Sequence, residues 1–328
     1  PLERIADAAN TGAESLVINL PGLETLPPEI GQLTHLQELS IRESGLTALP
    51  PEIGNLTNLI TLSLTDNSLT ELPSEISQLT SLQHLRLTGN DFTEVPIDIM
   101  QLTNLTSLSL DQNQLNELPP EIGQLVNLEW FDLRWNRISH LPPEIGQLTN
   151  LQNLNLGNNQ LSTLPPEIGN LTSLTSLEVF NNRLIEIPPD IGQLPNLRQL
   201  SVAYNQLTNI PPEIGQLVNL ESLSIDGNQL TELPAEIGQL VNLEELWVSD
   251  NLLTSLPDEF AQLTNLCKLY LSNNQLQVFP DELNQLELIT TDASCRINLD
   301  GNPLVDDPNQ EASRRILEAA RSHETELY

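Results

Sequence analysis

Side chains that could carry catalysis are scarce in this chain of 328 residues. Lys268 is its only lysine, and no phosphate-binding loop ending in Gly-Lys-Ser or Gly-Lys-Thr is present. The Gly-x-Ser-x-Gly segment of a serine hydrolase is also missing. The histidines lie far apart and lack the spacing of a zinc site. We therefore expect no catalytic residue, no cofactor and no metal ion, and we expect that the protein is not an enzyme. The histidines are His35, His84, His140 and His323.

Aromatic side chains that could bind a partner recur at a common spacing. Trp247 and Tyr270 are 23 residues apart, and Trp135 and Tyr204 are separated by three such intervals. Tryptophan, tyrosine and arginine are the side chains that most often anchor protein recognition. The shared interval indicates that one repeated element positions all of these residues.

The same interval runs through most of the chain. An asparagine recurs every 23 residues within the frame Leu-x-x-Leu-x-Leu-x-x-Asn-x-Leu, which is the pattern of leucine-rich repeats. Each repeat is one strand and a return segment, and it cannot bury its apolar side alone. Stacked neighbours must complete the core. The repeated asparagines are Asn67, Asn90, Asn113, Asn136, Asn159, Asn182, Asn205, Asn228, Asn251 and Asn274.

The frame gives each side chain a direction. Strand alternation sends Leu154 and Leu156 inward and leaves Asn153 and Asn155 facing out. Asn159 ends the strand, and we expect its amide to bond backbone groups of neighbouring turns. The Pro-Pro-Glu-Ile-Gly segment that follows cannot be a central strand, because proline lacks an amide donor. These directions predict an α/β leucine-rich repeat solenoid, shaped like a horseshoe, with a parallel sheet on its concave face and irregular or 3-10 structure on its convex side.

The repeat unit, written LPPEIGQLTNLQxLxLxxNQLTxLP, resembles the 23-residue leucine-rich repeats common in bacterial proteins. It is also similar to the repeats of plant intracellular Ras-group-related proteins, and the resemblance covers residues 13–304. It implies protein binding, because this scaffold is used mainly for that purpose. Both ends of the chain resemble those of leucine-rich repeat domains in secreted bacterial effectors of the E3 ubiquitin ligase type. Those arrays usually have shorter repeats, and we expect no ligase domain within residues 1–328.

The ends of the array depart from the repeat. We expect a cap helix and a degenerate first repeat over residues 1–35, tandem repeats over 36–288, and an irregular last repeat with a second cap helix over 289–328. Pro21 and Ser44 replace the first two asparagines of the series, and a five-residue insertion precedes Asn302. Phe279 is expected in the core. The second cap helix is expected over residues 308–321. The apolar face of the first cap helix is predicted to contain Leu2, Ile5, Ala6 and Ala9.

The formal net charge of −33 reflects a shortage of basic residues, 12 against 45 acidic ones. Such a surface repels nucleic acid and anionic lipid, so we expect neither as a partner, and a basic partner is mildly favoured. We expect a monomer. The chain does not begin with Met, so its start gives no information on secretion. The localisation is left open between the cytoplasm and a secreted effector delivered into host cells.

Cys267 and Cys295 are the only cysteines. They hold corresponding positions in adjacent repeats, at about the Cα separation that a disulfide requires. In-register neighbours of parallel strands often point alike, and free thiols are common in intracellular proteins. The two cysteines could form a disulfide or remain free thiols, and the free thiols are favoured.

Two functions fit the outward residues. The first is a non-catalytic module that binds a partner protein on the concave face, as the recognition part of a larger bacterial effector or signalling protein. The alternative is a surface that binds carbohydrate or a small ligand by stacking on the aromatic rings. Asp111 and Asp132, expected side by side on the sheet, could in principle hold calcium or act as an acid and base, but a solvated binding face is favoured. The predicted contact residues are Trp130, Asp132, Arg134, Trp135, Glu178, Phe180, Tyr204, Trp247, Lys268 and Tyr270.

Overall fold

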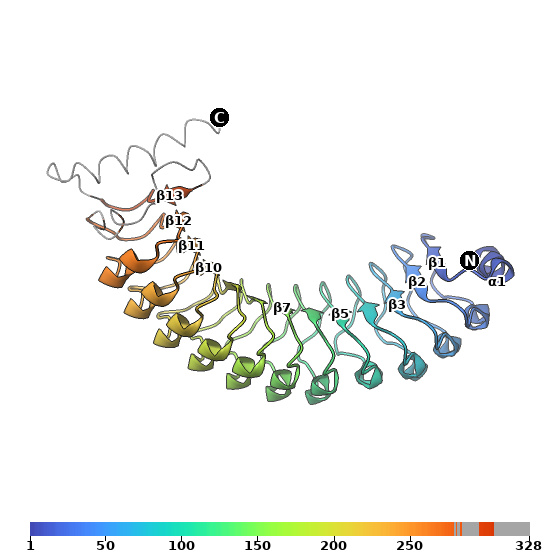
Figure 1. Ribbon diagram of the computed structural model, residues 1–328. Coiled ribbons are helices and arrows are strands. Elements are labelled where there is room, and N and C mark those ends of the chain that lie inside the picture. Colours follow the sequence, from blue (N-terminus) through green and yellow to red (C-terminus); the bar gives the residue numbers. More distant parts are fainter. Residues whose placement is uncertain (279, 281–282, 284–294, 305–328) are drawn as a thin grey trace. The chain divides into compact units, whose positions relative to one another are not determined.

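The computed structural model describes residues 1–278, 280, 283 and 295–304. The chain divides into two compact units, unit 1 over Pro1–Leu161 and unit 2 over Ser162–Tyr328. In each unit short parallel strands alternate with 3-10 helices, and the two kinds of element lie on opposite sides of the repeats (Figure 1). This confirms the leucine-rich repeat solenoid that the sequence predicts.

Unit 1 begins with helix α1 over Leu2–Thr11, followed by strands that pair in sequence order. The register advances by one repeat per strand, for example Ser15 to Glu38 and Leu39 to Leu62. Its 3-10 helices are η1 (Pro28–Gln32), η2 (Pro51–Asn55), η3 (Ser74–Gln78), η4 (Ile97–Gln101), η5 (Pro120–Gln124) and η6 (Pro143–Gln147). Its strands are β1 (Ser15–Ile18), β2 (Glu38–Ile41), β3 (Thr61–Ser63), β4 (His84–Arg86), β5 (Ser107–Ser109), β6 (Trp130–Asp132) and β7 (Asn153–Asn155).

Unit 2 repeats the same arrangement. Its last described pairing joins Lys268 to Arg296, so the five-residue insertion leaves the sheet register intact. Its 3-10 helices are η7 (Pro166–Asn170), η8 (Pro189–Gln193), η9 (Pro212–Gln216), η10 (Ala235–Gln239) and η11 (Asp258–Gln262). Its strands are β8 (Ser176–Glu178), β9 (Gln199–Ser201), β10 (Ser222–Ser224), β11 (Glu245–Trp247), β12 (Lys268–Tyr270) and β13 (Arg296–Asn298).

The predicted inward residues form the core. Leu154 and Leu156 are buried, and so are Phe92, Phe131 and Phe260. Phe279 and the second cap helix expected over 308–321 lie outside the described residues. Among the described residues, no helix is long and apolar enough to cross a membrane.

The face of the first cap helix differs from the prediction. Ile5 and Ala8 are its buried residues, whereas Leu2, Ala6 and Ala9 are exposed. Ile5 and Ala8 are three positions apart, which is enough to align them on one side of this short helix. Gly12 ends the helix in the left-handed conformation with φ 64°, and its amide donates to the carbonyl of Ala8.

The repeated asparagines form the expected ladder. The Nδ2 of Asn113 donates to the carbonyls of Leu87 and Leu110, both at 3.0 Å, and its Oδ1 accepts from the amide of Phe92 at 3.1 Å. Ser44 takes over part of this role, since its Oγ accepts from the amide of Leu20 at 3.2 Å. The ladder thereby joins each turn to the one before it.

A second asparagine ladder, which the sequence reasoning missed, runs through the turns that precede the strands. Asn104 donates from Nδ2 to the carbonyl of Thr80 at 2.8 Å, and Asn127 donates to Thr103 at 2.9 Å. In unit 2, Asn242 donates likewise to Val218 at 2.8 Å. The asparagine of the repeated Asn-Leu dipeptide therefore has a structural role, which is to bond the backbone of the preceding repeat.

Candidate functional site

The strand face of each unit consists of the outward side chains of its strands and of the turn residues that follow them. In unit 1 the predicted contact residues on this face come from a single repeat: Trp130 begins β6, Asp132 ends it, and Arg134 and Trp135 follow. The side chains of Trp130 and Trp135 are 46% and 58% exposed, whereas Asp132 is only 4% exposed. The two tryptophans are therefore available to a partner, and the aspartate is not.

Asp132 positions Arg134. The guanidinium Nε lies 3.0 Å from Oδ1 of the carboxylate, and Nη2 lies 2.7 Å from Oδ2, which is a bidentate ion pair. The sequence reasoning placed Asp132 among the contact residues, but burial gives it a supporting role instead. The arginine is thereby fixed on the same repeat as the two tryptophans.

The floor around these side chains is made of small polar residues. Trp130 pairs with Ser107 on β5 and with Asn153 on β7, and Asp132 pairs with Ser109 and Asn155. None of these neighbours is large enough to cover an indole ring. The exposure of Trp130 therefore follows from the neighbouring sequence as well as from its own position.

Trp135 and Tyr204 lie in turns, although the sequence reasoning assigned them to outward strand positions. Their φ angles are 56° and 54°, in the left-handed region. The corresponding residues of other repeats share this conformation, and they include Gly89, Gly227 and Asn158 as well as Asp66 and Gln112. A bulky side chain is less favourable there than glycine or asparagine. Both aromatic residues are 58% exposed, so burial in the core does not explain them.

We expect the change Trp135→Asn to raise the free energy of unfolding by about 1 kcal/mol, because asparagine tolerates this turn better than tryptophan. Urea unfolding of the variant and the wild-type protein measures the difference. Gln112→Asn, a change at the same turn position one repeat earlier, is the control and should have a smaller effect. An unchanged or lower stability of Trp135→Asn would show that the turn is not strained.

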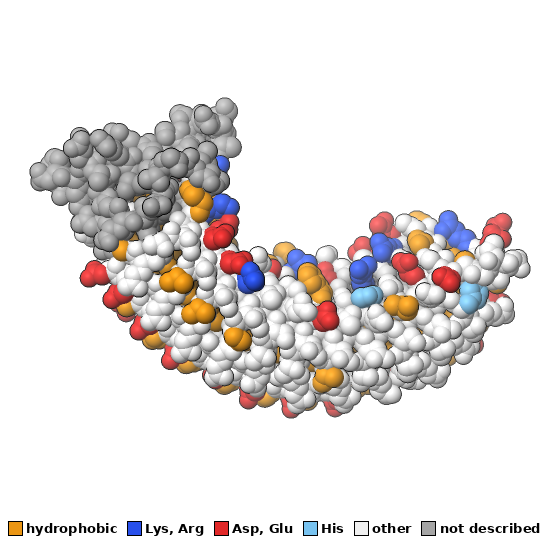
Figure 2. Space-filling view, viewed as in Figure 1, with side chains coloured by type: hydrophobic (Ala, Val, Ile, Leu, Met, Phe, Trp, Pro, Cys, Tyr) orange, Lys and Arg blue, Asp and Glu red, His pale blue; other side chains and the backbone are white. Residues whose placement is uncertain are grey.

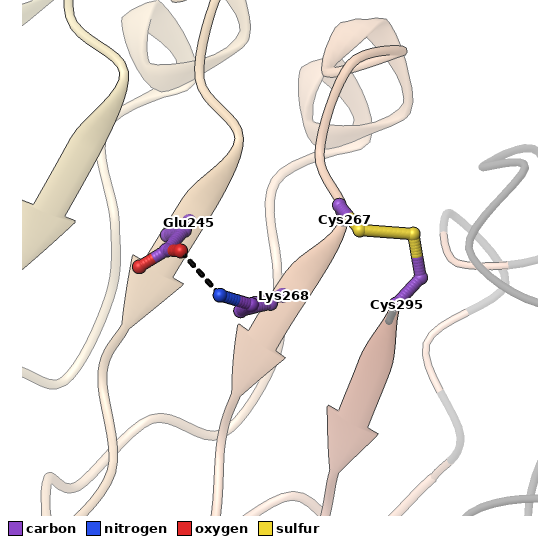
Figure 3. The surroundings of a disulfide bond; sticks show 4 residues. All are labelled: Glu245, Cys267, Lys268 and Cys295. Carbon is purple, nitrogen blue, oxygen red and sulfur yellow. Dashed lines mark hydrogen bonds and ion pairs between the residues drawn. A yellow bond between two sulfur atoms is a disulfide. The ribbon is translucent and has the colours of Figure 1, made fainter. Parts of the chain in front are cut away.

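The predicted residues of unit 2 form two groups. Trp247 and Tyr270 stack with ring centroids 3.9 Å apart and an interplanar angle of 15°, so each half-buries the other. Glu245 binds the neighbouring Lys268, with Oε1 and Nζ 2.6 Å apart (Figure 3). That hydrogen bond, together with the charge of Glu245, raises the pKa of Lys268. Lys268 is therefore already paired within the sheet.

The second group of unit 2 lies nearer its first strands. Glu178 ends β8 and Phe180 lies two residues further on, and both are half-buried. Tyr204 follows β9 and is the most exposed of the three. Its ring lies against Gly227 of the next repeat, where a Cβ atom would collide with it. Glycine at position 227 therefore makes room for the ring of Tyr204.

Besides Asp132, two further buried carboxylates lie on the strand faces in the part of the chain that the structure describes. In unit 1, Asp111 accepts a hydrogen bond from Oγ1 of Thr88 at 2.7 Å, and burial raises its pKa. Asp132 lies opposite Ser109 in the register, and the position of Asp111 corresponds to that of Arg134. In the part of the chain that the structure describes, no group of three or more acidic, histidine or cysteine side chains could hold a metal ion.

In unit 2 the buried carboxylate is Asp226, which the sequence reasoning did not select. It accepts from the amide of Ser249 at 2.8 Å and from Oγ of Ser224 at 3.1 Å. Burial raises its pKa, and the charge of Asp250 adds to that effect. Asp226 occupies the same position of the repeat as Arg134 and Phe180, and this shared position could have identified it as an outward residue of the strand face.

We expect Asp226→Asn to raise the stability of the protein near neutral pH. A folded-state pKa above the ordinary value of 3.8 means that the folded chain binds more protons than the unfolded chain between those two pKa values. The ionised side chain of Asp226 therefore destabilises the folded state at neutral pH, and this destabilisation decreases as the pH falls through the folded pKa towards 3.8. Urea unfolding at pH 7 and pH 4 should show that the gain from Asp226→Asn is larger at pH 7. Equal differences at the two pH values would contradict this.

Cys267 and Cys295 form a disulfide, and the expectation of free thiols is wrong. Each cysteine directly precedes a strand, β12 or β13, and their Cα atoms are 4.5 Å apart (Figure 3). The amide of Arg296 donates to the carbonyl of Cys267 at 2.8 Å, and this hydrogen bond joins the starts of β12 and β13. The bridge ties β13 covalently to the regular repeats.

A polar groove of ≈ 1070 Å³ lies in unit 1, along the edge where the strands begin. Its lining includes Gln37, Asn58, Gln83 and Asn104, and none of the predicted contact residues. Asn58 and Asn104 belong to the second asparagine ladder, so their amides already bond backbone carbonyls. The groove is explained by the structure of the repeats, whereas the exposed tryptophans are not.

Comparison with known proteins agrees with this geometry. A family model described as "Leucine-rich repeat region" matches residues 98–209, 145–229 and 188–291, and one described as "Leucine rich repeat" matches residues 34–92. The chain belongs to the leucine-rich repeat family, whose members are generally non-catalytic binding scaffolds. No catalytic family is indicated. The comparison with curated protein sequences gives no significant match.

Solved structures give the same assignment. A leucine-rich repeat protein of Leptospira interrogans has 44% identity and a TM-score of 0.84, over 91% of this chain and 74% of that one. The internalin InlF of Listeria monocytogenes has 22% identity and a TM-score of 0.80, over 96% and 92%, and shows the fold alone. The plant peptide hormone receptor RGFR1, solved in complex with RGF2, has 32% identity and a TM-score of 0.76, over 90% and 49%.

Proposed function

We propose that the chain is a protein-binding module and that its partner docks on the strand face. The observation that carries this proposal is the single repeat that presents Trp130, Arg134 and Trp135 together. Both indoles are exposed, the arginine is held in place by Asp132, and Trp135 occupies a strained turn. Exposed aromatic side chains beside an ordered arginine are typical of the residues that dominate binding energy. The family commonly mediates protein–protein interaction, which supports the proposal.

Unit 2 offers further contact residues on its own strand face. Tyr204 is exposed, and the stacked Trp247 and Tyr270 present an ordered aromatic surface next to Lys268. The plant peptide hormone receptor RGFR1, solved in complex with RGF2, is one example of a similar chain with a bound partner. In this proposal the chain acts as a monomer and as the recognition part of a larger bacterial effector or signalling protein.

The distribution of charge also supports docking on this face. In unit 1, Arg42, Arg86 and Arg134 belong to the strand face, whereas the glutamates of the repeated Pro-Glu-Ile segments lie in the 3-10 helices on the other side. In Figure 2 the basic side chains in view lie along the rim that carries the strands, with acidic ones among them, and further acidic side chains lie along the opposite side. A partner therefore meets less negative charge at the strand face than elsewhere on the unit.

The test begins with a photo-crosslinking amino acid at Ser109, on the strand face, and a control at Glu121, in η5. The partner captured from Ser109 is purified, and its dissociation constant is measured by calorimetry. We expect Trp130→Ala to weaken binding about thirtyfold, or ~2 kcal/mol, because a central exposed aromatic anchor is lost. Glu121→Ala should leave affinity unchanged.

A partner whose affinity survives the combined change of Trp130, Trp135 and Trp247 to alanine would place the site elsewhere. The carbohydrate alternative makes a different prediction, because exposed rings such as Trp135 and Tyr204 could also stack on sugars. A glycan array separates the two functions: specific glycan binding that Trp135→Ala abolishes would favour the alternative.

A further inference from the structure

Asp226 of unit 2 is a buried carboxylate with unused acceptor capacity. Its side chain is 9% exposed and accepts hydrogen bonds from the amide of Ser249 and from Oγ of Ser224. A backbone hydrogen bond of Asp226 itself also favours the ionised form, and a carboxylate offers about four acceptor positions, so these bonds from protein groups do not use all of them. Over residues 1–278, 280, 283 and 295–304, no lysine, arginine or histidine lies within ion-pair distance of it.

This unpaired state differs from that of the acidic residues in unit 1. Asp132 is neutralised by the bidentate contact with Arg134, and the charge of Arg134 also favours the ionised form of Asp111. The charged neighbour of Asp226 is another acid, Asp250. A buried carboxylate without a cation is costly to the fold. The hydrogen bonds alone do not require a charge, since asparagine could accept from the amide of Ser249 and donate to Oγ of Ser224.

The repeats on both sides of Asp226 carry aromatic side chains. On the β9 side, the ring of Tyr204 lies against Gly227, the residue directly after Asp226. On the β11 side, Trp247 pairs in register with Ser224, whose hydroxyl donates to Asp226. The stack on Tyr270 fixes the indole of Trp247 in place. A carboxylate with aromatic rings on the neighbouring repeats supplies the two interactions that bind organic cations, ion pairing and cation–π attraction.

We propose that Asp226, Tyr204 and Trp247 form a receptor for one basic side chain, a lysine or arginine, of a partner protein. The inference deepens the proposed function and rests on it for the nature of the partner. Charge complementarity selects this occupant, because a cation is what the buried carboxylate lacks, while an anionic group would meet Asp226 and Asp250 together. The net charge of −33 also steers basic proteins towards the chain.

The experiment uses the full chain and three capped tripeptides of the form acetyl-Gly-X-Gly-amide, in which X is lysine, arginine or norleucine. Norleucine keeps most of the lysine side chain and removes its charge. Binding is followed by the NMR shift of the Trp247 indole, assigned with Trp247→Phe. We expect the lysine and arginine peptides to bind at least roughly tenfold more tightly than the norleucine peptide.

Asp226→Asn removes the charge, keeps the bond from the amide of Ser249 and reverses the bond with Ser224, and it should weaken binding of the two basic peptides by roughly tenfold or more. Asp250→Asn, which removes a charge from an exposed neighbour, is the matched control and should change affinity by less than about threefold. Thermal unfolding followed by circular dichroism verifies that each variant is folded. Tyr204→Leu should weaken binding of the lysine peptide by roughly fivefold, through the loss of the cation–π contact.

The inference is overturned if no basic peptide binds, if norleucine binds as well as lysine, or if Asp226→Asn keeps the wild-type affinity. These outcomes differ from failure of the proposed function. A partner that depends on Trp130 while the peptides ignore Asp226 would sink only the cation receptor. Peptide binding that depends on Asp226, with a partner insensitive to Trp130, would leave the receptor standing and move the docking surface.

Discussion

Replacing Cys267 and Cys295 together by serine is expected to lower the free energy of unfolding by about 3.5 kcal/mol. The bridge joins residues with a sequence separation of 28, and closing a loop of that length restricts the unfolded chain by about this amount. The change also frees β13 from its covalent tie to the repeat before it. Urea unfolding of the oxidised wild-type protein and the double variant measures the difference.

Two controls make this result specific. Wild-type protein unfolded with a reducing agent should behave like the double variant, and the reducing agent should not change the double variant. Mass spectrometry of the unreduced wild-type protein should find no free thiol. A loss below about 1 kcal/mol, with the bridge shown to be intact in the wild type, would mean that the loop is already restricted in the unfolded state.

Changing Leu108 to alanine is expected to cost about 3 kcal/mol of stability in unit 1. Leu108 is fully buried in β5, between Leu85 and Phe131 in the register, so its loss leaves a cavity. Asn113→Ala should cost a similar amount, because the buried carbonyls of Leu87 and Leu110 and the amide of Phe92 would each lose a partner.

Chemical denaturation measures both variants of the core. Stability in a repeat array is close to a sum over neighbours, so a defect within unit 1 should divide unfolding into two stages. Gln112→Ala, next to Asn113 but on the surface of the turn, should change stability by less than about 0.5 kcal/mol. A single unchanged transition for Leu108→Ala or Asn113→Ala would contradict the assigned frame.

The repeated fold could be predicted from the sequence because the same local rule acts many times. The alternation of Leu154, Leu156 and their neighbours fixes which side of the strand is buried, and the repeat length fixes the register. Asn159 and its equivalents were predicted as a ladder because the strand end leaves backbone groups that need partners. The bond of Asn104 to the backbone carbonyl of Thr80 was not predicted, because the frame does not show that this turn lies against the preceding one at that point.

The candidate site was only partly predictable. A frame identifies an outward position, but it does not give the exposure of the side chain or its contacts. It could not distinguish Trp130, which stands free, from Trp247, which stacks on Tyr270. The burial of Asp132 and Asp226 depends on side chains of neighbouring repeats, which the frame of one repeat does not show. The disulfide depends on how the irregular repeat brings Cys295 next to Cys267.

The disulfide also couples stability to the cell compartment. Bridges of this kind persist where the surroundings are oxidising and are uncommon where glutathione keeps thiols reduced. In a reducing compartment β13 would be held to β12 by hydrogen bonds and packing alone, whereas unit 1 contains no cysteine and would be unaffected directly. The redox state around the protein therefore acts on one end of unit 2, the end at which the regular repeats stop.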